Sequence, residues 1–135
     1  MIERSFDIAG LTKALEHRPV SDFNPEHWLL DERNMAFTNQ HGDFALFEAD
    51  IPGVYTGHYF YNSRGKAAIS FSKDVLREVF MGGHGVGVIR GMVPLYHVAA
   101  RWMTRRLGFS SYGVVKTDPP CELFLLTKQE YLHNG

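Results

Sequence analysis

The chain has 135 residues, of which 44% are hydrophobic and 21% charged, and its formal net charge is −1. These values fit one ordinary globular domain, so we expect residues 1–135 to form a single domain. The near-neutral charge argues against nucleic acid or an anionic membrane surface as the partner. The single cysteine, Cys121, excludes a disulfide within the chain and leaves most zinc-site templates without ligands.

The sequence pattern argues against two further classes of protein, those that span a membrane and those that carry a signal peptide. No run approaches the roughly 18 apolar residues of a membrane span, and the first residues lack the apolar core of a signal peptide. We therefore expect a reduced, cytoplasmic protein that does not enter a membrane. The seven histidines match neither HExxH nor a paired i, i+4 spacing, so no metal site is predicted.

The first part of the chain predicts two short helices followed by a β-meander. Residues 9–17 have a helical spacing of leucines that ends at Pro19. Asn24 followed by Pro25 is typical of a helix start, which predicts a second helix over 25–32. Polar turns at 40–43 and 52–53 then separate three apolar runs. We predict these runs as antiparallel strands over 35–38, 44–50 and 54–62.

The rest of the chain predicts alternating helices and strands. A helix is expected after Gly65, with Ser72 capping its regular part and Gly82-Gly83 ending it. A second long helix is expected over 95–107. Three strands complete the prediction, the last two joined by a turn at Asp118-Pro119-Pro120, and they cover 85–92, 112–116 and 122–127.

The stretch from 93 to 115 is the most informative part of the sequence. Its helix has one apolar face at a spacing of 3.6 residues, formed by Leu95, Val98, Ala99, Trp102, Met103 and Leu107. Arg101, Arg105 and Arg106 are expected on its solvated side. Gly108 then supplies the left-handed stop that follows many helices, and Phe109 can fold back onto the last turn.

This helix and its Leu-Gly-Phe ending resemble the last helix of the GNAT-fold acyltransferases. Residues 62–67 (NSRGKA) are similar to the phosphate loop of that family, Gln/Arg-x-x-Gly-x-Gly/Ala, although Asn62 departs from the usual Gln or Arg. The order of elements also agrees over 35–127. The resemblance implies an α/β (α+β) fold with a mostly antiparallel, splayed sheet of about six or seven strands, flanked by about four helices.

The resemblance further implies an acyl-CoA-dependent N-acyltransferase that uses acetyl-CoA or another acyl-CoA. Its acceptor would be an amine on a small molecule or a protein. The candidate catalytic residues are Glu48 and His58, either of which could act as the general base from a central strand, and Tyr96. The candidate cofactor-binding residues are Tyr61, Asn62, Arg64, Gly65, Lys66, Ala67 and His97.

A second, non-enzymatic hypothesis stays open at this point. Thr104 stands where many members of the family have a tyrosine that acts as the general acid, and His97 stands where the helix pattern usually starts with Asn. Small GNAT-like chains with such departures resemble virion and head-assembly proteins of tailed phages, which would place this chain in a virion among other virion proteins. A homodimer is also expected to be possible, through an exposed edge at the strand over 122–127.

Overall fold

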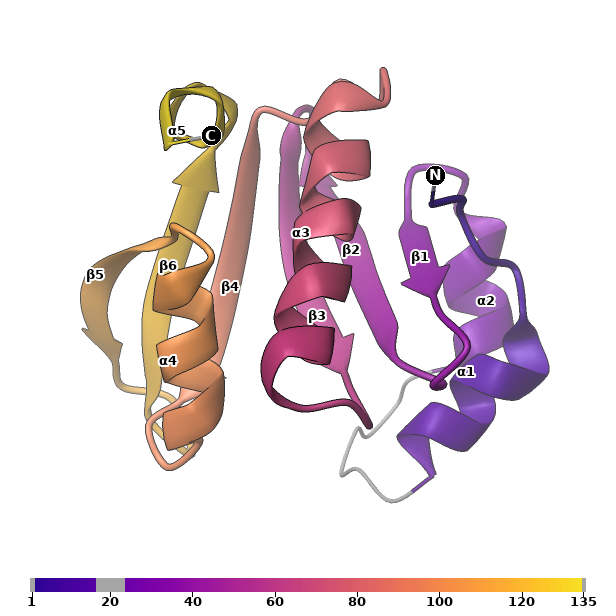
Figure 1. Cartoon of the computed structure of the whole chain (residues 1–135), viewed down its shortest axis with the longest axis horizontal. Coiled ribbons are helices and arrows are strands. Elements are labelled where there is room, and N and C mark those ends of the chain that lie inside the picture. Colours follow the sequence, from indigo (N-terminus) through magenta and orange to yellow (C-terminus); the bar gives the residue numbers. More distant parts are fainter. Residues whose placement is uncertain (1, 17–23, 135) are drawn as a thin grey trace.

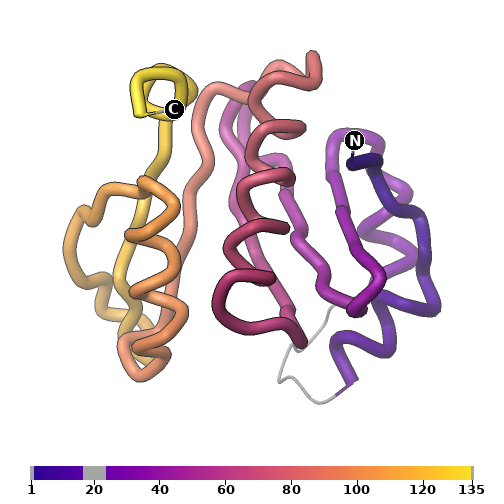
Figure 2. The backbone as a smooth tube through the Cα atoms, in the orientation of Figure 1, coloured from indigo at the N-terminus to yellow at the C-terminus, as the bar shows by residue number. Residues whose placement is uncertain are grey.

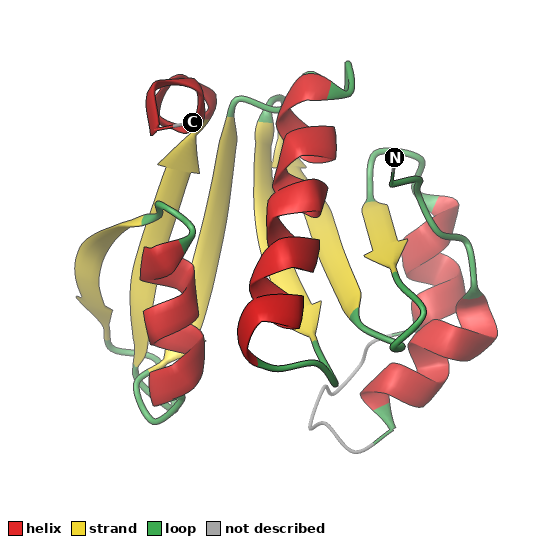
Figure 3. Cartoon of the chain, in the orientation of Figure 1, coloured by secondary structure: helices red, strands yellow, loops and turns green. Residues whose placement is uncertain are grey.

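The computed structural model describes residues 2–16 and 24–134. Within these residues, six strands form one sheet in the order β1-β2-β3-β4-β6-β5, flanked by five helices (Figures 1 and 3). The strands are β1 (Met35–Thr38), β2 (Phe44–Ile51), β3 (Val54–Phe60), β4 (Val88–Pro94), β5 (Ser110–Val115) and β6 (Cys121–Thr127). The helices are α1 (Ile8–Leu15), α2 (Pro25–Leu30), α3 (Gly65–Met81), α4 (Val98–Arg106) and α5 (Lys128–Asn134). Among the described residues, no helix has the length and apolar character that crossing a bilayer requires.

The sheet splits between its two central strands. β3 and β4 run parallel and pair only near their starts, with Thr56 opposite Arg90 as the last pair. β4 instead pairs with β6 along its whole length, from Val88 to Pro94. Because β3 and β4 have separate partners beyond Thr56, they diverge there, as Figures 1 and 2 show. This confirms the predicted splayed sheet, whose split lies between the strands before and after the first long helix.

Each face of the sheet has its own apolar core. On one face, Val79 and Phe80 of α3 pack against Phe47 of β2. On the other face, Leu11 of α1 packs against Leu46 of β2. The alternation of side chains along β2 thus sends neighbouring residues to opposite cores, as its sequence predicts.

The starts of the helices follow from local sequence. The Asn24 side chain accepts hydrogen bonds from the backbone N–H groups of Glu26 and His27, and Pro25 occupies the first helical position, which confirms the predicted start of α2. In α1, Asp7 accepts a hydrogen bond from the backbone N–H of Gly10. The predicted end of that first helix at Pro19 lies outside the described residues.

Two predictions about the elements are wrong, and one helix was not predicted. Ser72 does not cap α3; it is buried inside a helix that begins at Gly65. The strand over 122–127 is not an edge, because β5 covers it and the described edges are β1 and β5. The exposed edge on which a homodimer was predicted is therefore absent at this strand. The helix α5, which directly follows β6, was not expected at all.

The apolar face predicted for the second long helix is also wrong. Trp102 exposes 57% of its surface and Val98 is exposed as well, whereas Thr104 is the buried residue of α4. Leu95 lies before the helix, which begins at Val98. The reason is that α4 borders the split in the sheet, so part of its apolar surface faces a cleft instead of a closed core.

Candidate functional site

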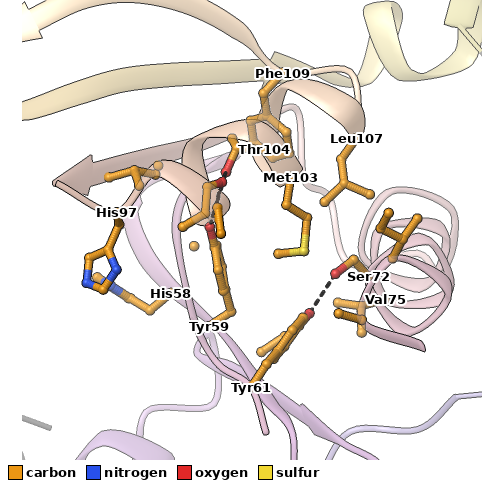
Figure 4. A pocket seen from close by; sticks show the side chains of 18 of the residues that line it. His58, Tyr59, Tyr61, Ser72, Val75, His97, Met103, Thr104, Leu107 and Phe109 are labelled. Carbon is orange, nitrogen blue, oxygen red and sulfur yellow. Dashed lines mark hydrogen bonds between the residues drawn. The ribbon is translucent and has the colours of Figure 1, made fainter. Parts of the chain in front are cut away.

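A cleft of about 550 Å³ occupies the split between β3 and β4. Side chains of both strands line it, and α3 and α4 form its walls, as Figure 4 shows from close by. Met103 of α4 and Leu107, which directly follows this helix, contribute apolar surface, and Val75 contributes it from α3. The cleft exists because parallel strands that stop pairing leave room between them, which two helices on the same face of the sheet then enclose.

Tyr59 of β3 and Tyr61, which directly follows the strand, connect this segment to the two helices (Figure 4). The hydroxyl of Tyr61 lies 2.8 Å from Oγ of Ser72 in α3. The hydroxyl of Tyr59 lies 3.1 Å from Oγ1 of Thr104 in α4 and donates to the carbonyl oxygen of Ala100 at 3.3 Å. Burial raises the pKa of both tyrosines, an effect that the hydrogen bonds to Thr104 and Ser72 oppose, so both hydroxyls keep their protons at neutral pH.

The N-terminal turn of α3 lies at one end of the cleft. Gly65 has a positive φ of 61°, and a Cβ atom built there would meet no atom within 4 Å. The first N–H groups of a helix have no acceptor inside the helix, and they carry the positive end of its dipole. Arg64, which lines the cleft together with Gly65, adds a formal positive charge. This end of the cleft is therefore suited to an anion such as a phosphate.

The loop that leads to this turn is fixed from behind by a buried carboxylate. The backbone N–H groups of Asn62 and Ser63 donate to Oδ1 of Asp43, at 2.6 and 2.9 Å. Burial raises the pKa of Asp43, but hydrogen bonds from Ser63, Asn39 and Asn62 outweigh that effect and leave the pKa below its ordinary value. The Asn62 carboxamide donates to the carbonyl oxygen of His41 at 3.0 Å, so this side chain binds the backbone of the β1–β2 loop.

The two candidate bases lie close to each other. Nε2 of His58 is 3.8 Å from Oε2 of Glu48, and each side chain exposes nearly half of its surface. Burial lowers the pKa of His58, whereas the charge of Glu48 acts in the opposite direction. A histidine with a lowered pKa is neutral near pH 7 and can accept a proton. His58 lines the cleft, and Glu48 supports it from the neighbouring strand.

The other predicted site residues divide into two groups. Tyr61, Arg64, Gly65 and His97 line the cleft together with His58. The remaining predicted residues are not among those that line it, and they are Glu48, Asn62, Lys66, Ala67 and Tyr96. The Tyr96 ring is largely exposed and contacts the ring of His97, with centroids 4.5 Å apart.

Sequence reasoning missed the contact between Tyr59 and Thr104. Tyr59 and Tyr61 stand two positions apart in the strand predicted over 54–62, so alternation alone would have placed them on the same face. The partner of Tyr59 could not be foreseen, because Thr104 lies 45 positions along the chain.

A buried carboxylate also holds α4 in place. Glu122 of β6 accepts a hydrogen bond from Nε of Arg101 at 2.8 Å, and it forms a second ion pair with Arg105. Its side chain exposes only 5% of its surface. The prediction of a solvated arginine face is therefore wrong for Arg101, whose side chain exposes 28% of its surface, whereas the Arg105 side chain exposes 49% although its guanidinium group pairs with Glu122. The helix that borders the cleft is thereby tied to the sheet.

Metal chemistry finds no support in the described part of the chain. No group of three or more His, Cys, Asp or Glu side chains within 2–16 and 24–134 is arranged to hold a metal ion. The chemistry available in the cleft is that of a histidine base, tyrosine hydroxyls and a cationic helix start.

Comparison with known proteins identifies the fold. No protein-family model matches the sequence, and no curated protein matches it. Among solved structures, an F149A mutant of the spermidine N-acetyltransferase SpeG from Vibrio cholerae superimposes with a TM-score of 0.82 at 11% identity, over 99% of this chain and 98% of that one. The aminoglycoside acetyltransferase AAC(6')-Ib, solved with ribostamycin and coenzyme A, gives 0.70 at 18% identity, over 98% and 94%. The chain has the GNAT fold, which confirms the predicted architecture.

Proposed function

We propose that this chain is an acyl-CoA-dependent N-acyltransferase. The observation that supports this most strongly is the position of the cleft: it lies in the split between β3 and β4 and ends at the open first turn of α3, beside Arg64. A ligand whose anionic group is bound at that turn would extend along the cleft. Structures of AAC(6')-Ib, which share the fold, contain coenzyme A or acetyl-CoA.

The residues present fit such a ligand. The N–H groups of the first turn of α3, with Arg64, would hold the diphosphate of the cofactor, because they combine free donors with positive charge. Met103 and Leu107 would contact the less polar arm. When bound, an acyl-CoA supplies an activated thioester that an amine can attack.

The proposal gives the roles of general base and supporting carboxylate to His58 and Glu48. His58 would accept the proton that the acceptor amine must lose, since its lowered pKa leaves it neutral near pH 7. Glu48, at 3.8 Å, would stabilise the imidazolium that results. Tyr96 has no role in this proposal, because it is not among the residues that line the cleft.

The acceptor in this proposal is an amine. SpeG is named as a spermidine/spermine N-acetyltransferase, and AAC(6')-Ib as an aminoglycoside acetyltransferase, so both act on amines. An enzyme of this kind would work in the cytoplasm.

One observation favours the alternative, a catalytically silent component of a phage virion that contacts other virion proteins. Thr104 occupies the position where a tyrosine is common in the family, and its hydroxyl is already bonded to Tyr59. On this alternative the cleft would be a remnant without a ligand.

Binding of acetyl-CoA separates the two. A ligand at about 100 times its dissociation constant stabilises a protein by roughly 2.7 kcal/mol, which a thermal unfolding series detects. We expect the melting temperature to rise with acetyl-CoA concentration. An unchanged melting temperature at millimolar acetyl-CoA would contradict the enzyme and favour the virion component.

A further inference from the structure

The carboxylate of Asp43 takes no part in the steps above, yet it contacts the loop that leads to Gly65. The residue is fully buried at the end of the β1–β2 loop. Its Oδ1 accepts hydrogen bonds from the backbone N–H groups of Asn62 and Ser63, and its Oδ2 accepts one from Nδ2 of Asn39 at 2.9 Å. A buried charge with this many donors around it is stabilised in one geometry, so it fixes the atoms that bind it.

The contact is reciprocal. Asp43 binds the backbone of residues 62 and 63, and the carboxamide of Asn62 in turn donates to the carbonyl oxygens of His41 and Gly42. Two side chains on two loops thus each satisfy the backbone of the other loop. We call this set of contacts, formed by Asp43, Asn62 and Ser63 with the carbonyls of 41 and 42, the loop clamp.

The loop clamp decides which N–H groups remain available to a ligand. Those of Asn62 and Ser63 are occupied by Asp43, so the N–H groups that can meet an anion in the cleft begin at Arg64. Glycine at position 65 turns the chain sharply at this point, with its φ of 61°. The direction of the first turn of α3 therefore depends on the two bonds that precede it.

We propose that Asp43 is a positioning residue for recognition of the cofactor's diphosphate: by holding the N–H groups of Asn62 and Ser63, its carboxylate aims the first turn of α3 into the cleft. The inference rests on the proposed function, since it assumes that an acyl-CoA binds there. It assigns to Asp43 an effect on affinity for the diphosphate and none on the thioester arm.

The pair formed by Asn39 and Asp43 permits a sharp test. In Asp43→Asn, the side chain has one oxygen and one NH₂ group. If the oxygen accepts hydrogen bonds from the two loop N–H groups, the new NH₂ group faces the NH₂ group of Asn39, so that two donors oppose each other. The double variant Asn39→Asp/Asp43→Asn exchanges the two groups. The carboxamide oxygen at position 43 then accepts the loop N–H groups, and its NH₂ donates to the carboxylate at position 39. Asp74→Asn, which removes the same charge from an exposed position on α3, is the control.

The experiment compares dissociation constants for acetyl-CoA and for S-acetylpantetheine, which has the thioester arm without the diphosphate. For Asp43→Asn we expect acetyl-CoA affinity to fall by about tenfold or more, while S-acetylpantetheine affinity stays unchanged. The exchanged pair should restore acetyl-CoA affinity, and amide hydrogen exchange at Asn62 and Ser63 should be fast in the single variant and slow in the exchanged one. Asp74→Asn should behave as the natural chain.

Two results would overturn the inference while leaving the proposed function intact. One is unchanged acetyl-CoA affinity in Asp43→Asn; the other is an equal loss for both ligands, which would indicate a general loss of structure. If the natural chain binds no acetyl-CoA, the proposed function itself fails, and the inference fails with it.

Discussion

The hydroxyl of Tyr59 lies 3.1 Å from Oγ1 of Thr104, and this contact joins β3 to α4 across the cleft. Two positions further along, Tyr61 makes the corresponding contact with Ser72 of α3. β3 and the residue that directly follows it thus hold both helices that enclose the cleft. The width of the cleft therefore depends on two side-chain hydrogen bonds as well as on the packing of the core.

A double-mutant cycle of Tyr59→Phe and Thr104→Val measures the first of these bonds. Each variant removes one hydroxyl and keeps the shape of its side chain. We expect Tyr59→Phe to lower the free energy of unfolding by about 1 kcal/mol, and the coupling energy of the pair to be similar, as is usual for a hydrogen bond inside a protein. Urea unfolding at pH 7 gives all four values. Strictly additive losses would show that the two hydroxyls do not interact.

The ion pairs of Glu122 predict a loss of stability that depends on pH. Burial raises the pKa of Glu122, but Ser111, Arg101 and Arg105 outweigh that effect and lower it below 4.5. Because the native state lowers this pKa, the stabilisation is present above the ordinary pKa and disappears as the pH falls through the native one. We expect Glu122→Gln to cost about 3 kcal/mol at pH 7 and progressively less below pH 4.5, measured by urea unfolding.

Two arginines of α4 provide the control for this prediction. Arg101→Ala removes a guanidinium group bound to Glu122 and should lower the free energy of unfolding clearly. Arg106→Ala, on the exposed side of the same helix, should change it by less than about 0.5 kcal/mol. Equal effects of the two substitutions would show that the pairs with Glu122 do not stabilise the helix.

The proposed base predicts the acidic limb of the pH–rate profile. Burial lowers the pKa of His58, and the charges of Glu48 and Asp50 raise it, with the burial effect larger. A base works in its neutral form, so activity should rise with pH around a midpoint below 6.5. Glu48→Gln removes one charge that raises this pKa, so the midpoint should move to lower pH.

His58→Gln should remove that limb and lower kcat by roughly a hundredfold, as is typical for loss of a general base. His27→Gln, on the exposed surface of α2, is the matched control and should leave the profile unchanged. A profile that keeps its limb in His58→Gln would assign the base to another group.

Gly65 offers a matched pair of substitutions for the anion site. Both Gly65→Ala and Gly65→Glu carry the same backbone strain, because φ is positive, and neither Cβ meets another atom. Only glutamate brings a negative charge to the first turn of α3. We expect acetyl-CoA to bind Gly65→Glu at least about tenfold more weakly than Gly65→Ala. Gly83→Glu, also at an open position with positive φ but beyond the far end of α3, should bind as the natural chain. Equal affinity of the two Gly65 variants would place the anion elsewhere.

The fold could be predicted wherever a local pattern determines the structure. Asn24 with Pro25 marks a helix start through their own side chains, and Gly108 supplies the left-handed residue after α4, with a φ of 100°. Strand alternation likewise placed Leu46 and Phe47 on opposite faces. These features depend on neighbours a few positions away, which a sequence displays directly.

The site was harder to predict because its main contacts join distant parts of the chain. Asp43 belongs to a predicted surface turn, yet it is fully buried and accepts hydrogen bonds from residues 19 and 20 positions later. Glu122 is a charged residue of the kind that is usually exposed on a strand, and its partners Arg101 and Arg105 belong to α4. Trp102 shows the remaining case: periodicity finds an apolar face, but it does not say whether that face meets a core or a cleft.

Acyl-CoA is proposed to bind in the split of the sheet with its diphosphate at the first turn of α3. Titration of the ¹⁵N-labelled chain with acetyl-CoA, followed by amide NMR spectra, would reveal this binding residue by residue. We predict saturable shifts at Gly65, Lys66 and Ala67 and along the diverging parts of β3 and β4, with little change in α1. Spectra that do not change at millimolar acetyl-CoA, or shifts confined to other surfaces, would contradict the claim.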